Sequence, residues 1–94
     1  MKLYVCVRKD LTPSQRAVQA GHALAEYMLD SPSWKNSTLI YLGVKGLNQL
    51  ENLKRKLEYA EIKHYPFYEP DLDNQITAIA SDNPSTIFKK LNLL

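Results

Sequence analysis

The chain has 94 residues, of which 45% are hydrophobic and 23% charged, and this composition is typical of one globular domain. Its formal charge of +2 is too small to require a polyanionic partner, although the basic residues are clustered. The run Met1–Val7 is too short for a signal peptide, and no apolar run approaches the roughly 20 residues of a membrane span. The single cysteine, Cys6, excludes an internal disulfide. We therefore expect one domain over residues 1–94, located in the reducing cytoplasm.

The first predicted elements are a buried strand and an amphipathic helix. Residues Leu3–Val7 are strand formers bounded by charged residues. Thr12 supplies a capping hydroxyl, Pro13 stands at the first helical position, and Gln15 completes a capping box. The helix should run to about Leu29.

The middle of the chain alternates between strand and helix patterns. Thr38–Val44 is apolar and β-branched enough for a second buried strand. Leucines at helical spacing predict a second amphipathic helix over Leu47–Ala60. Lys63–Glu69, which contains Pro66, fits an edge strand, and Ile76–Ala80 fits a short apolar strand.

The last predicted element is a helix that ends near Leu91. Its amino-terminal cap is the segment Asn83–Ser85. The order strand, helix, strand, helix, strand, strand, helix predicts a three-layer α/β/α fold with a mixed four-stranded sheet. If the first three strands run parallel, their carboxyl ends meet at one rim of the sheet. That rim would bring Arg8–Leu11 next to Glu69–Gln75.

The predicted rim carries the groups that ester hydrolysis needs. The link Glu69–Gln75 is longer and more acidic than a tight hairpin requires. Its carboxylates, opposite Arg8, Lys9 and His22, could deprotonate a water while a cation or amide stabilises the oxyanion. No serine or cysteine is placed as a covalent nucleophile. A structural interpretation stays open, in which Asp10 pairs with Arg8 or caps the first helix and the acidic link is solvated.

Metal binding at this link is disfavoured. Glu69, Asp71 and Asp73 lack the glycine and the terminal glutamate of a calcium loop, and no second histidine adds to this set of ligands. We expect neither a metal nor a cofactor.

These residues resemble the type-2 peptidyl-tRNA hydrolases, small α/β proteins that cut the ester between a peptide and tRNA. The matching positions are Arg8, Asp10 and Leu11 after the first strand, Ala17, Gln19, Gly21, His22 and Ala23 on the first helix, and Gln75-Ile76 before the strand Thr77-Ala78-Ile79-Ala80. The order of elements matches over nearly the whole chain. Two features depart from the family: its lysine before the helical motif is replaced by Gln15 or Arg16, and its acidic turn here lacks glycine and arginine.

The resemblance implies a cytoplasmic hydrolase that cleaves the ester between a peptide or acyl group and tRNA, and whose partner is the tRNA acceptor end. The catalytic residues it implies are Asp10, His22, Asp71 and Gln75. The implied substrate-binding residues are Arg8, Lys9, Gln15, Arg16, Gln19, Glu69, Asp73, Asn74, Lys54 and Arg55. The alternative function is a non-catalytic module of the same fold that binds RNA or a protein.

Basic and aromatic side chains provide candidate RNA contacts, because backbone neutralisation dominates nucleic-acid affinity and unpaired bases stack on aromatic rings. A structural interpretation accounts for these residues equally well: the basic side chains solvate a helix surface, and the aromatic side chains pack in the core or at a dimer interface. The candidates are Lys9, Arg16, Lys45 and the run Lys54–Lys56 for phosphate, and Trp34, Tyr65, Phe67 and Tyr68 for bases.

The apolar chain end favours association of two copies. Leu91, Leu93 and Leu94, together with a tyrosine-rich surface, would gain stability from a partner subunit. We therefore expect a homodimer.

Overall fold

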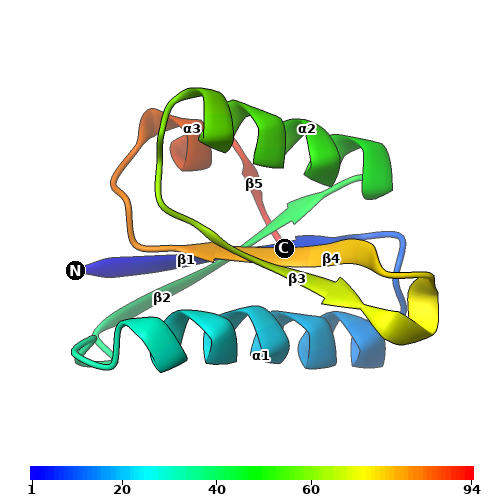
Figure 1. Cartoon of the computed structure of the whole chain (residues 1–94), viewed down its shortest axis with the longest axis horizontal. Helices are drawn as coiled ribbons and strands as arrows, with labels where there is room; N and C mark the ends of the chain where they lie inside the picture. The colour runs from blue at the N-terminus through cyan, green and yellow to red at the C-terminus, as the bar shows by residue number, and fades with distance from the viewer.

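A computed structural model describes all residues from 1 to 94 as a mixed β-sheet between two helical layers (Figure 1). The elements in chain order are β1 (Lys2–Arg8), α1 (Pro13–Asp30), β2 (Thr38–Val44), α2 (Leu47–Tyr59), β3 (Tyr65–Glu69), the 3-10 helix η1 (Pro70–Leu72), β4 (Gln75–Ser81), α3 (Thr86–Lys89) and β5 (Asn92–Leu93).

The sheet has the strand order β3-β4-β1-β2-β5. β1 and β2 are parallel, while β4 runs antiparallel to both of its neighbours, β1 and β3. It follows that β1, β2 and β3 all point the same way, as the sequence predicted. Their carboxyl ends therefore share one rim of the sheet.

The prediction of a four-stranded sheet was wrong, because the sheet has five strands. β5 pairs antiparallel with β2 through only two residues, Leu42 with Leu93 and Gly43 with Asn92. A two-residue strand has too little alternation to stand out in a sequence. The last helix is also shorter than expected, because it ends at Lys89 and the chain then turns into β5.

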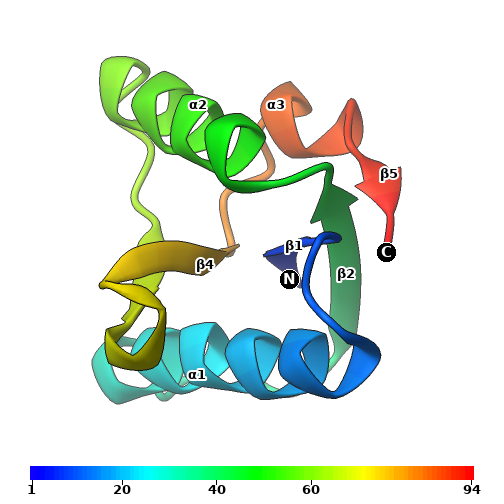
Figure 2. The same ribbon diagram turned by 90° about the vertical axis from the view of Figure 1, so that its right-hand side faces the viewer.

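α1 covers one face of the sheet alone, as Figure 2 shows. Ala20 and Ala23 are fully buried there against Val5 and Val7, and Tyr27 fills the far end. Small side chains let the helix backbone approach the strands closely, so α1 holds a fixed position over β1, β3 and β4. Thr12 and Gln15 form the predicted capping box, which fixes where α1 begins.

α2 and α3 cover the opposite face (Figure 2). Leu50, Leu53 and Leu57 of α2 and Phe88 of α3 bury their side chains there around Cys6. Burial raises the pKa of the Cys6 thiol to about 12, so this side chain stays protonated and acts as a small apolar core residue. None of the helices combines the length and apolarity that crossing a bilayer requires.

Candidate active site

Arg8 joins the two chain segments that the sequence predicted to meet. It lies at the end of β1 with only 6% of its surface exposed. Its Nε and Nη2 atoms donate to the two carboxylate oxygens of Asp10 at 3.0 and 2.7 Å. Its Nη1 atom donates to Gln75 Oε1 at 3.0 Å and to the Ile76 carbonyl at 3.2 Å. The buried guanidinium of Arg8 thus reaches from β1 to a residue of β4 that is 67 positions away in the chain.

The contact between Arg8 and Asp10 favours the charged form of both side chains. The hydrogen bond from Arg8 lowers the pKa of Asp10, with burial opposing that shift and the charges of Arg8 and Arg16 adding to it. The hydrogen bond to Asp10 correspondingly raises the pKa of Arg8. Asp10 is therefore an anion at neutral pH and a weak base, which suits a residue that orients its neighbours.

A second polar network lies next to the first, between α1 and the β3–β4 hairpin. The buried amide of Gln19 donates to Glu69 Oε1 at 2.9 Å, and Thr77 Oγ1 donates to Gln19 Oε1 at 2.7 Å. Glu69 stands opposite Gln75 in the β3–β4 ladder, so the two networks adjoin. The Asp71 N–H donates weakly to Glu69 Oε2 at 3.4 Å. The amide of Gln19 therefore sets the direction of the Glu69 carboxylate.

His22 lies three residues further along α1 than Gln19. Its exposed ring stacks on Phe67, with ring centroids 4.2 Å apart and planes 5° from parallel. It makes no hydrogen bond with Asp10, Asp71 or Gln75. The structure thus joins Asp10 to Gln75 through Arg8 and sets Asp71 beside Glu69, while His22 occupies the adjoining seam between α1 and β3.

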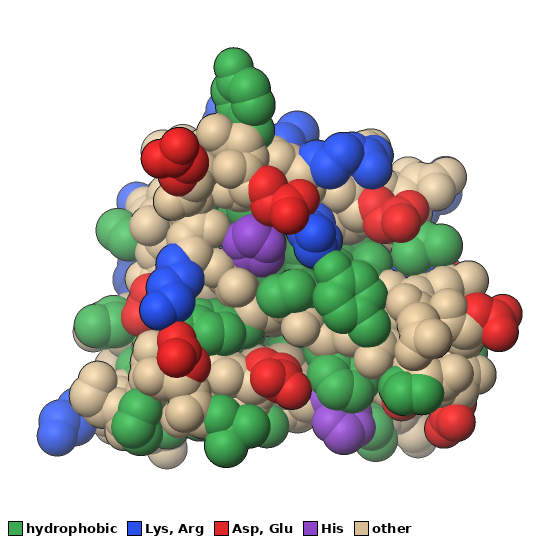
Figure 3. All heavy atoms as spheres, in the orientation of Figure 1, with side chains coloured by type: hydrophobic (Ala, Val, Ile, Leu, Met, Phe, Trp, Pro, Cys, Tyr) green, Lys and Arg blue, Asp and Glu red, His purple; other side chains and the backbone are tan.

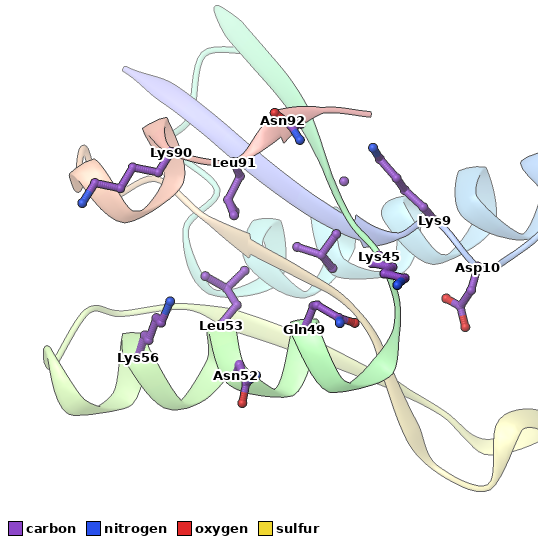
Figure 4. A pocket seen from close by; sticks show the side chains of 12 residues that line it. Lys9, Asp10, Lys45, Gln49, Asn52, Leu53, Lys56, Lys90, Leu91 and Asn92 are labelled. Atoms are coloured by element: carbon purple, nitrogen blue, oxygen red, sulfur yellow. The ribbon is translucent and has the colours of Figure 1, made fainter.

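The polar networks border two separate hollows. The smaller cavity, of about 280 Å³, is lined by Gln15, Gln19, Glu69 and Asp71 among others. The larger cleft, of about 560 Å³, lies between the ends of β1 and β2, α2 and the chain end, and Asp10 borders it (Figure 4). Asp10 and Glu69 consequently face different spaces.

Other predicted substrate-binding residues mainly contact the protein itself. Arg16 donates to the backbone carbonyls of Leu11 and Lys9 and so holds the loop after β1. Lys54 pairs with Glu58 at 3.0 Å, and Arg55 donates to Asn52. Asp73 and Asn74 are exposed and adopt left-handed backbone conformations in the β3–β4 link. Lys9 and Lys45 do line the larger cleft.

The aromatic residues that were predicted to stack on RNA bases are also mostly packed within the protein. Trp34, Tyr65 and Phe67 pack against the core beneath α1, whereas Tyr68 is an exposed aromatic side chain. The face drawn in Figure 3 intersperses acidic, basic and apolar side chains without a large patch of one charge. The described chain contains no group of three or more His, Cys, Asp or Glu side chains arranged to hold a metal ion.

Several residues of the larger cleft were not predicted from the sequence. Lys90 and Asn92 follow α3, where the sequence predicted helix and no strand. Gln49 and Asn52 lie on the same face of α2 as Lys56, which the sequence had marked as a candidate phosphate contact, and the three- and four-residue spacing of these residues was a usable signal. Thr77 was noted only as a strand residue, although its hydroxyl binds Gln19.

No family model matches the sequence, and a search of curated proteins finds no match. Among solved structures, a protein of unknown function from Agrobacterium tumefaciens strain C58 superposes with a TM-score of 0.78. The two sequences are 12% identical, and the superposition covers 99% of this chain and 96% of that chain. At this identity the likeness shows the fold alone, so both chains share the same α/β architecture over nearly their whole length.

Proposed function

We propose that this protein hydrolyses the ester that links a peptide or acyl group to tRNA. The observation that carries the proposal is the bonding of Arg8 to both Asp10 and Gln75, since it unites the two segments in which the sequence resembles type-2 peptidyl-tRNA hydrolases. The adjoining Gln19 and Glu69 pair supplies an oriented carboxylate beside a cavity of about 280 Å³.

In the proposed reaction, Glu69 is the general base. Gln19 engages one of its oxygens, and the second accepts only a long contact from the Asp71 N–H, so that oxygen is available to a water in the smaller cavity. Glu69 takes a proton from this water, whose oxygen attacks the ester carbonyl, and the tRNA alkoxide leaves with that proton. Gln15 lines the same cavity, and its oxygen already accepts from Thr12, so in this proposal its side-chain NH2 is the donor that stabilises the oxyanion.

Arg8 and Asp10 act as positioning residues in this proposal. Every hydrogen bond of the Arg8 guanidinium goes to a protein oxygen, so Arg8 fixes Gln75 opposite Glu69 instead of binding the ester itself. By holding the neighbours of Glu69 in place, such contacts maintain the geometry that an oriented base requires.

The test is hydrolysis of purified peptidyl-tRNA by matched variants. Glu69→Gln should lower kcat by about 10²-fold or more, because it removes the base while keeping an acceptor for Gln19. Glu26→Gln is the control, since Glu26 is an exposed residue of α1 with no hydrogen-bond partner. Equal activity of the two variants would contradict the role of Glu69. Asp10→Ala and His22→Ala should also weaken cleavage.

A second candidate is a non-catalytic module that binds RNA or a protein. It is favoured by the complete internal bonding of Arg8 and Gln19, because no buried side-chain polar atom lacks a partner and the networks are stable without a substrate. Tight tRNA binding without any ester cleavage by the wild-type protein would select this candidate.

A further inference from the structure

The larger cleft gathers positive charge that the proposed hydrolysis does not use. Lys9, Lys45, Lys56 and Lys90 line it, and Asp10 is the sole acidic residue among its walls. This local excess of positive charge is larger than the net charge of +2 of the whole chain. None of the four lysines forms a salt bridge within the protein. A cleft with this balance attracts small anions.

We propose that this cleft binds the linked phosphates of a nucleotide. Ammonium groups bind phosphate oxygens as point charges, and the side-chain amides of Gln49, Asn52 and Asn92 can donate to the remaining oxygens. Val44 and Leu53 give the cleft an apolar part against which a sugar or base can lie. The volume of about 560 Å³ falls within the range of small-molecule sites.

Gly43 leaves room for the side chain of one of these lysines. The Lys9 N–H donates to the Val44 carbonyl at 2.8 Å, and the Lys9 carbonyl accepts from Arg16, so the backbone of Lys9 is fixed. Its side chain then crosses β2 at Gly43, where an added Cβ would stand 2.7 Å from Lys9 Cε and 3.0 Å from Cγ. A side chain at position 43 would displace Lys9, so the glycine preserves its path along the cleft.

The lysines enter the cleft from different elements. Lys9 reaches toward the side on which Asn92 lies, Lys56 rises from α2 at the far end, and Lys90 extends outward at the edge (Figure 4). A nucleotide would therefore be held between Lys9 and Lys56, with Lys90 swinging inward. No aromatic side chain lines the cleft, so recognition rests on the phosphates and not on base stacking.

Two kinds of ligand carry phosphates that fit this cleft, namely a free nucleotide and the end of a single-stranded RNA. We would titrate the protein with ADP by calorimetry, and with a fluorescent four-nucleotide RNA by anisotropy, at low salt. Neither measurement requires turnover, so a failure of the hydrolase proposal leaves this one standing. If ADP binds more tightly than the RNA, the ligand of the cleft is a free nucleotide. If the RNA binds more tightly and ADP displaces it, the ligand is the end of an RNA strand.

Matched variants localise the binding. Lys56→Gln should weaken binding of the preferred probe by about tenfold, because it removes a charged donor. Lys89→Gln removes the same charge from α3 outside the cleft and should change binding by less than about twofold. Gly43→Ala should also weaken binding, because it displaces Lys9. If circular dichroism shows that Gly43→Ala is unfolded, Lys9→Gln serves as the test variant in its place. Absence of saturable binding of both probes, or equal losses in Lys56→Gln and Lys89→Gln, would overturn the proposal.

Discussion

Arg8 shows how one side chain can organise a site without facing solvent. A buried guanidinium needs acceptors for its donors, and here a carboxylate, an amide oxygen and a backbone carbonyl supply them. The sequence predicts that Arg8 and Asp10 lie at the rim of the sheet but does not decide whether they pair with each other. They do pair, and the same arginine also holds Gln75. The bonding of Arg8 depends on Gln75 and Ile76 of β4, which residue spacing near position 8 could not reveal.

Asp10→Asn should lower stability and flatten its pH dependence. Because the hydrogen bond from Arg8 lowers the pKa of Asp10 in the folded state, the ionised carboxylate contributes stability above the unfolded pKa near 4. That contribution is lost as the pH falls through the lowered folded pKa. The side chain is 43% exposed, so solvent screening limits the effect at pH 7 to about 1 kcal/mol or less.

The measurement is urea unfolding of the wild type and of Asp10→Asn at several values from pH 7 to pH 3. The difference between their free energies of unfolding should be constant down to about pH 4 and shrink below it. A difference that stays the same at pH 3 would mean that the charge of Asp10 contributes nothing.

At the scale of elements, local rules predicted the helices well and the chain end poorly. The Thr12 and Gln15 capping box starts α1 where the sequence placed it, because capping depends on residues close together in sequence. β5 was missed because a two-residue strand exists only through its pairing with β2. The same omission concealed Lys90 and Asn92, and with them much of the larger cleft.

Gly21 provides a test within α1. It lies on the exposed side of the helix, and an added Cβ would meet no atom within 4 Å. Gly21→Ala should therefore raise the free energy of unfolding by about 0.5–1 kcal/mol, because alanine loses less backbone entropy in a helix. Thermal unfolding followed by circular dichroism measures the change, and a lower midpoint for the variant would contradict this description of α1.

At the scale of the whole molecule, strand direction decides what the protein can do. Because β1, β2 and β3 run the same way, Asp10 and Glu69 come to one rim, as the sequence predicted. The sequence did not predict that the Arg8 and Gln75 contact would leave them facing separate hollows. That division depends on how α1 and α2 pack on opposite faces of the sheet, which is a property of tertiary structure.

We predict that two copies of the chain associate through the exposed leucines of the chain end. Leu93 is 73% exposed on β5 and Leu94 is exposed beside it, and a dimer interface would cover them. Sedimentation should give the mass of a dimer for the wild type and of a monomer for Leu93→Asp. Leu29→Asp is the control, because Leu29 is 81% exposed on α1 and should leave the mass unchanged. A wild type that sediments as a monomer at high concentration would contradict the prediction.

Hydrolysis of peptidyl-tRNA by this protein is tested most directly by a single-turnover assay with enzyme in excess over the labelled substrate. The wild-type protein should release the peptide in a single exponential phase, while Glu69→Gln should bind the same tRNA with unchanged affinity and release peptide at least about 10²-fold more slowly. Bound tRNA that stays fully acylated in the presence of the wild-type protein would contradict the proposed hydrolysis.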